Sequence, residues 1–214
     1  MNIFLKEWIY FIILIIISIF VFILNINFHI SQPLWPDVQT YQSIAKNIGL
    51  NPFNTDFREP LWIWIIKLSE FFPGKEELII RSTSYLFFVI TCLLFFLLCN
   101  KIINSRFISF FFTCILIFYP HLNVIGFSGI RDNGINIIII SYIYLFYSYP
   151  FHKIKFFLIT LTCMAVLIKT NLFISFLSIN IIIFFFKKDY KFLLYSFISS
   201  FIFLLIIIFY QYIQ

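Results

Sequence analysis

The sequence predicts an all-α membrane protein, a polytopic transmembrane helical bundle of about seven spans, and three observations support this. Of the 214 residues, 62% are hydrophobic and only 11% are charged, and the mean hydropathy is +1.01. Apolar runs long enough for a bilayer core of about 30 Å recur along the whole chain. They show no alternating strand pattern, so helices are the expected means of pairing backbone polar groups in hydrocarbon.

A long loop follows the first expected span, and short loops separate the other spans. The run after Lys6 resembles the apolar part of a signal peptide, but it is too long and no small-residue cleavage site follows, so we expect it to stay as an anchor. The chain is expected to form a single membrane domain, 1–214. Hydropathy places the spans near Ile9–Ile26, Leu78–Cys99, Phe107–Val124, Ile135–Tyr149, Ile154–Ile168, Leu172–Phe186 and Phe192–Tyr212.

The loop 27–77 is expected to lie outside the membrane and to carry two interfacial helices, near 37–48 and 61–72. The first is amphipathic, because apolar side chains recur there at helical spacing. The second reaches only about 18 Å at 1.5 Å per residue and contains charges, so it is too short to span. Trp62 and Trp64 are expected at the level of the lipid headgroups.

Basic residues between the spans predict the orientation. In a seven-span arrangement the short-loop cations fall on one side, which the positive-inside rule makes cytoplasmic. Three polar segments then share the outer face: 27–77, 120–133 and 169–171. The cations in question are Lys6, Lys101, Arg106, Lys153, Lys155, Lys187, Lys188 and Lys191.

Two classes of site are disfavoured by the distribution of residues. The net charge of +6 is dispersed between apolar runs, so it argues for membrane-flanking charges and against nucleic-acid binding. The cysteines lie inside expected spans without metal-ligand spacing, so they are interpreted as small buried apolar residues and no metal ligand is assigned. They are Cys92, Cys99, Cys114 and Cys163.

The loop 27–77 holds the first candidate residues. Asp37 precedes the amphipathic helix, where it either caps the helix or acts as a general base. Arg58 and Glu59 stand directly before a proline and an apolar helix. They form either a surface ion pair at a helix start or, through Arg58, a site for phosphate or carboxylate.

The other two outer segments hold the remaining candidates. Arg131 and Asp132 follow two glycines at the entrance to a span. Either Arg131 snorkels towards the headgroups and Asp132 caps the following helix, or Arg131 binds a polar lipid headgroup as substrate. Lys169 must lie at or slightly inside the outer membrane boundary, where an ionisable group is a functional hypothesis and snorkelling is the alternative.

Together these outer residues resemble the membrane-embedded C-type glycosyltransferases, specifically bacterial relatives of the dolichyl-phosphate-mannose protein mannosyltransferases. The match covers an amino-terminal module that occupies nearly the whole chain, which is therefore expected to be a minimal member, a fragment or a decayed product. The matching motifs, in order, are Pro36-Asp37 with Tyr41 and Ala45, then Arg58-Glu59-Pro60-Leu61, then Tyr119-Pro120, then Gly129-Ile130-Arg131-Asp132.

The resemblance implies transfer of a sugar from a polyprenyl-phosphate donor to an unidentified acceptor, at the outer face of a bacterial inner membrane. Asp37 is then the catalytic base. A lone Asp37 stands where several family members carry adjacent acidic residues, so a requirement for a divalent metal is left open. The substrate contacts implied are Tyr41, Arg58, Glu59, Arg131, Asp132 and Lys169.

Three other functions fit the same composition. A polysaccharide polymerase-like protein would also handle lipid-linked sugars with outer charged residues. A flippase or small transporter would line a path through the membrane with basic residues, which this arrangement of charges disfavours. A noncatalytic partner protein would use the outer loop only to pack against another subunit.

Overall fold

The structure, a computed structural model, describes residues 3–49, 55, 60–129 and 131–212. These residues form ten α-helices and one 3-10 helix, which confirms the all-α prediction for the described chain. In order the elements are α1 (Ile3–Ile30), α2 (Pro36–Asn47), α3 (Pro60–Lys67), η1 (Leu68–Phe71), α4 (Glu76–Ile103), α5 (Arg106–Phe118), α6 (Pro120–Phe127), α7 (Asp132–Ser148), α8 (Phe151–Ile168), α9 (Leu172–Lys187) and α10 (Tyr190–Tyr212).

The chain divides into two compact units, each made of two stretches of sequence. Unit 1 contains Met1–Val38 and Phe72–Ser148, and unit 2 contains Gln39–Phe71 and Tyr149–Gln214. The boundary falls inside α2, whose first turn belongs to unit 1. That both units form a single membrane domain stays a prediction.

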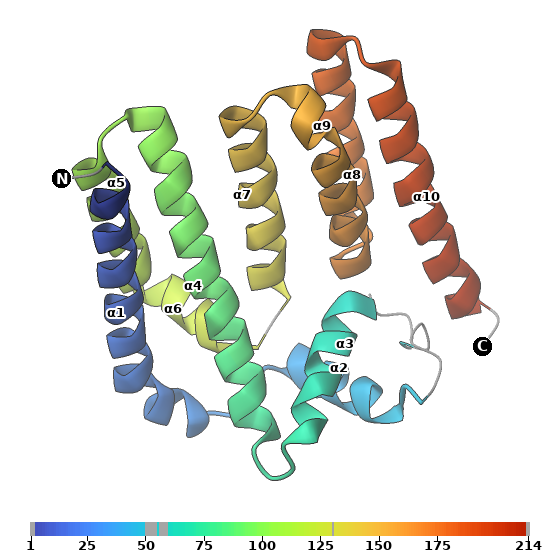
Figure 1. Cartoon of the computed structure of the whole chain (residues 1–214). Helices are drawn as coiled ribbons and strands as arrows, with labels where there is room; N and C mark the ends of the chain where they lie inside the picture. The colour runs from blue at the N-terminus through green and yellow to red at the C-terminus, as the bar shows by residue number, and fades with distance from the viewer. Residues whose placement is uncertain (1–2, 50–54, 56–59, 130, 213–214) are drawn as a thin grey trace. The chain divides into compact units, whose positions relative to one another are not determined.

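In unit 1, α4 is the central helix and packs against α1, α5, α6 and α7 (Figure 1). Helices α5 and α6 meet at a bend of 64°. Tyr119 is extended at this bend and Pro120 is the first residue of α6. A proline has no N–H to donate and suits a helix start, so it ends α5 and begins a new direction.

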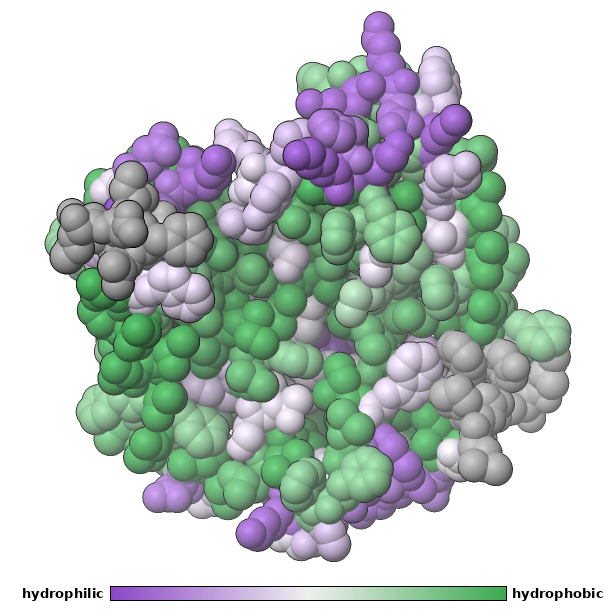
Figure 2. All heavy atoms as spheres, in the orientation of Figure 1, coloured by the Kyte–Doolittle hydropathy of each residue, from purple (hydrophilic) through white to green (hydrophobic). Residues whose placement is uncertain are grey.

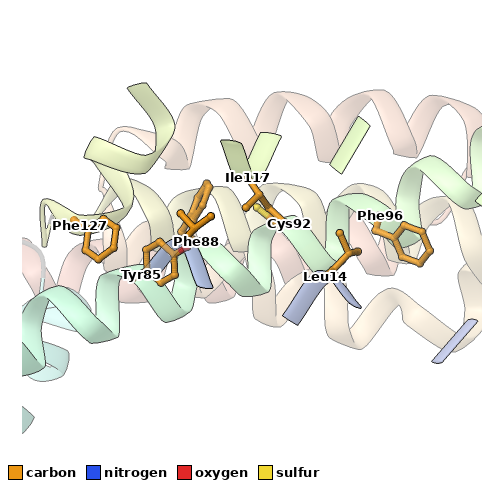
Figure 3. Close-up of a cluster of buried hydrophobic side chains, with 8 residues drawn as sticks. Leu14, Tyr85, Phe88, Cys92, Phe96, Ile117 and Phe127 are labelled. Atoms are coloured by element: carbon orange, nitrogen blue, oxygen red, sulfur yellow. The ribbon is translucent and has the colours of Figure 1, made fainter. Parts of the chain in front are cut away.

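The core of unit 1 is a row of side chains along one face of α4 (Figure 3). Tyr85, Phe88, Cys92 and Phe96 recur at spacings of three or four residues, which places them on the same side of the helix. Leu14 from α1 and other side chains from α5 and α6 cover this row. Aromatic rings dominate, and Phe11 meets Phe96 edge to face with centroids 5.4 Å apart.

In unit 2, α8, α9 and α10 pack against one another, and α3 packs on α8. Val166, Leu167 and Ile207 form a buried cluster there. At the other end of α8, the rings of Phe151 and Phe192 meet edge to face with centroids 5.0 Å apart. Unit 2 is therefore a three-helix assembly with a short helix against one end.

In the described part of the chain, four helices are long and apolar enough to cross a membrane, or up to five if the bent pair α5 and α6 is one span. These four lie within α1, α4, α8 and α10. Helix α9 is apolar but has 16 residues, and α7 has 17, so at 1.5 Å per residue they reach only about 24 to 26 Å. The chain is an integral membrane protein by these criteria, and its seven spans stay a prediction.

The face shown in Figure 2 is mostly apolar, with hydrophilic residues gathered near its edges. Ile16 and Ile23 on α1, for example, are 59% and 61% exposed. Such faces are unfavourable in water but match hydrocarbon. Within unit 2, Nζ of Lys155 at the start of α8 lies 3.6 Å from Oδ2 of Asp189, directly before α10. The side of the membrane on which these helix ends lie stays a prediction.

Helices occur at both expected places in the loop 27–77, although their position at the membrane interface stays a prediction. The apolar positions of α2 are buried, in agreement with its predicted amphipathic pattern. Trp62 on α3 is only 2% exposed, so protein rather than lipid headgroups covers its side chain. The sequence pattern alone does not distinguish a protein interior from the membrane interface.

Candidate functional site

Close packing at Gly129 joins two of the polar segments within unit 1. Gly129 has φ of +78°, and a Cβ added there would lie 2.8 Å from Cγ2 of Ile80 and 3.1 Å from Cγ1 of Val38. Only glycine fits, because both the backbone conformation and the space exclude a side chain. The start of α2, which carries Asp37, therefore lies against the turn that leads to Arg131 and Asp132.

Arg81, one residue after Ile80, is a buried cation that ties three segments together. Its side chain is only 3% exposed. Nη2 donates to the carbonyl of Gln32 at 2.6 Å and Nη1 donates to the carbonyl of Phe127 at 3.2 Å. Nε and Nη2 also bind Oε1 of Glu77, at 2.9 and 2.6 Å, so the charge is paired within α4. The planar guanidinium carries five N–H donors in a fixed geometry, which makes this set of bonds possible.

Asn133 fastens the start of α7 in the same region. It is 1% exposed, and its Nδ2 donates to Oγ of Ser84 at 2.8 Å and to the carbonyl of Ile125 at 3.1 Å. These bonds fix α7 to α4 and to α6. The neighbours Arg131 and Asp132 are thereby carried on a rigid helix entrance.

Phe127, whose carbonyl accepts from Arg81, is also the centre of a stack of aromatic rings. The rings of His29 and Tyr85 each lie 4.5 Å from that of Phe127 and nearly parallel to it. The Tyr85 hydroxyl donates to the carbonyl of Ser18 at 2.9 Å. The stack gives the end of α6 a rigid attachment to α1 and α4.

His29 also lines a cavity of about 300 Å³ between α1 and the bend of α5 and α6. Asn25 and Asn123 contribute polar groups to its lining. Among the described residues, Oδ1 of Asn123 is buried without a hydrogen-bond donor, whereas its Nδ2 donates to the carbonyls of Ile117 and Tyr119.

Three predicted site residues lie in unit 1. Asp37 is exposed and is the second residue of α2. It stands inside the first turn rather than at the cap position, where its charge complements the helix dipole. Arg131 is half-buried in the turn before α7, and Asp132, the first residue of α7, is exposed. The Gly129 contact brings their two segments together.

Two predicted site residues lie in unit 2. Tyr41 on α2 is 3% exposed, so most of its ring is covered by protein. Lys169 is half-buried in the break between α8 and α9, where its N–H donates to the carbonyl of Ala165 at 2.9 Å. Arg58 and Glu59 lie outside the described residues.

Sequence reasoning missed Arg81, which was placed within an ordinary apolar span. One signal was available, because Glu77 precedes it by four residues and such pairs meet on one face of a helix. The two carbonyl acceptors come from segments more than 40 residues away. No periodicity in the sequence reports those contacts.

The described residues contain no group of three or more His, Cys, Asp or Glu side chains arranged to hold a metal ion. The chain matches no known protein-family model, no curated protein and no solved structure.

Proposed function

We propose that the protein is a membrane glycosyltransferase that moves a sugar from a polyprenyl-phosphate donor to an acceptor at the outer face of a bacterial inner membrane. Asp37 is the general base in this proposal. Tyr41, Arg58, Glu59, Arg131, Asp132 and Lys169 contact the substrates.

The proposed reaction is a displacement at the anomeric carbon of the sugar. A carboxylate oxygen of Asp37 accepts the proton of the acceptor hydroxyl while that oxygen forms its bond to the anomeric carbon. The bond from that carbon to the phosphate oxygen breaks, and the electron pair leaves with the polyprenyl phosphate. A guanidinium or ammonium group stabilises the charge that develops on the leaving phosphate, and Arg131 is the candidate in unit 1.

The packing of Val38 against Gly129 carries this proposal. It puts the exposed carboxylate of Asp37 and the cation of Arg131 on two segments that touch each other in unit 1. Arg81 and Asn133 hold those segments through buried and partly buried hydrogen bonds. Catalytic groups need such rigid support, because a reacting geometry tolerates little displacement.

The proposal includes the seven-span topology. Helices α7 and α9 would then each span the bilayer with the help of their flanking residues. A short span is accommodated by local thinning of the bilayer or by snorkelling side chains. Three polar segments would meet the donor at the outer face. The basic ends of the helices would lie in the cytoplasm.

The deciding experiment measures transfer of labelled sugar from polyprenyl-phosphate donors in membranes that contain the full chain. Asp37→Asn should lower transfer by about 100-fold or more, because general-base catalysis contributes that much and the amide cannot accept the proton. The helix and its packing should be kept, since Asn is nearly the same size as Asp.

Asp189→Asn is the matched control, because it removes one carboxylate next to a helix start in unit 2. It should leave transfer close to the wild-type value at equal expression. Equal transfer by Asp37→Asn and wild type would exclude Asp37 as the base. Absence of transfer with every donor would favour the noncatalytic partner protein over the enzyme.

A further inference from the structure

Unit 1 contains a second polar cavity at the end of α4 that is remote from Arg81. It has a volume of about 870 Å³ and opens between the start of α1, the α4–α5 turn and α7. Lys101 in its lining is about 30 Å along α4 from Arg81 at 1.5 Å per residue. That distance equals the thickness of a bilayer core, so the cavity lies at a headgroup level when α4 spans the membrane.

The polar lining of this cavity has the chemistry of an anion site. Two side chains are cations, two are amides and two are phenols, and the described lining residues include no carboxylate. All of them can donate hydrogen bonds. These residues are Tyr10, Asn100, Lys101, Asn104, Arg106 and Tyr144.

The turn between α4 and α5 places the two cations on opposite sides of a short break. Asn104 has φ of +56°, and its N–H donates to the carbonyl of Asn100 at 3.0 Å. Helix α5 then begins at Arg106, with the Oγ of Ser105 as its cap. Lys101 is exposed and Arg106 is half-buried, which suits a ligand that enters from the headgroup region.

Aromatic packing holds one wall of the cavity. The ring of Tyr10 lies 5.4 Å from that of Phe110 and 6.1 Å from that of Phe96, measured between centroids. These contacts fix α1 against α4 and α5. The cavity is therefore formed by packed helices of one unit rather than by a loose surface loop.

We infer that this cavity binds the phosphodiester of an anionic lipid headgroup. Lys101 and Arg106 supply the charge, and the amides and phenols supply further donors to phosphate oxygens. Ile9 and Leu97 in the lining continue towards the apolar faces of α1 and α4, where acyl chains would lie. This site is separate from the proposed transfer reaction and does not depend on it.

The test uses the purified full chain in a neutral detergent and follows its thermal unfolding as lipid is added. Phosphatidylglycerol should raise the unfolding temperature in a saturable way and phosphatidylcholine should not, because a ligand that binds only the folded state stabilises it. In Lys101→Gln/Arg106→Gln the apparent affinity for phosphatidylglycerol should fall about tenfold or more, because both cations that attract the anionic headgroup are removed.

Lys187→Gln/Lys188→Gln is the matched control, because it removes two positive charges from the end of α9, outside the lining of this cavity. An equal fall in affinity for both double variants would show diffuse attraction to anionic lipid and would overturn the site. Equal protection by inorganic phosphate would assign the cavity to a soluble anion and overturn the lipid ligand. If the double variant does not fold, Lys101→Gln alone should show the same direction of effect, since this side chain is exposed.

Discussion

Arg81 donates from Nη1 to the backbone carbonyl of Phe127 across 3.2 Å, and this bond joins the first turns of α4 to the end of α6. The carbonyl belongs to a residue whose ring is completely buried in the core of unit 1. The polar contact and the aromatic core therefore support the same segment. The Gly129 turn follows directly after it.

Replacing Arg81 by methionine should destabilise unit 1 by about 2 kcal/mol. The apolar side chain fills similar space but leaves the buried carbonyl of Phe127 without this donor. The free energy of unfolding in detergent is the measurement. Lys75→Met is the control and should cost less than about 0.5 kcal/mol, because Lys75 is an exposed cation directly before the same helix and makes no side-chain cap bond. Equal losses in the two variants would contradict a structural role for the carbonyl bonds.

Gly129→Ala should destabilise the fold and lower sugar transfer. The added Cβ would lie 2.8 Å from Cγ2 of Ile80 and 3.1 Å from Cγ1 of Val38, so the turn would have to move away from α4 and from the start of α2. Gly74→Ala is a close control, because Gly74 has the same φ of +78° with nothing within 4 Å of the added Cβ. Both variants carry the backbone cost of about 1 kcal/mol. Only Gly129→Ala should lose more stability than this backbone cost. Equal unfolding temperatures of the two variants would contradict the close packing around Gly129.

Asn133→Ala should cost about 2 kcal/mol of stability, because it removes a buried donor from Ser84 and from the carbonyl of Ile125. Asn136→Ala on the same helix is the control. Asn136 is exposed, so its loss should change stability by less than about 0.5 kcal/mol. Chemical unfolding curves of the two variants give the comparison, and a smaller effect at position 133 than at 136 would contradict the assigned contacts.

The capping carboxylate of Asp189 predicts a pH dependence in unit 2. The N–H of Phe192, which donates to Oδ1 at 3.0 Å, and the ammonium of Lys155 at 3.6 Å from Oδ2 lower the pKa of Asp189 below its usual 3.8. A lowered folded-state pKa stabilises the fold above pH 3.8, and this contribution is lost as the pH falls through the folded-state value.

Asp189→Ala should therefore be less stable than wild type at neutral pH by about 0.5 to 1 kcal/mol, the usual cost of losing a helix cap. The difference should shrink as the pH falls below 3.8. Unfolding temperatures of both proteins across this range are the measurement. A difference that stays constant at all pH values would show that the charge of Asp189 plays no part.

The sequence by itself determined the helical class and most of the helix positions. Long apolar runs permit only helices in hydrocarbon, so the described spans follow from composition and length. The spacing of Val38, Tyr41 and Ile44 likewise predicted the amphipathic helix α2, and all three side chains are buried. Local periodicity was sufficient for these features, because a helix is a local structure.

Tertiary structure alone decided which polar residues share a site. Asp37 was predicted at a helix cap or as a base, but only the contact of Val38 with Gly129 brings its segment to that of Arg131. Arg81 lies in an apolar helix, and its acceptors come from distant segments. Such contacts depend on how helices cross and on the space that glycine leaves, and neither property has a period in the sequence. Hydropathy therefore located the helices, whereas packing between them determined the geometry of the site.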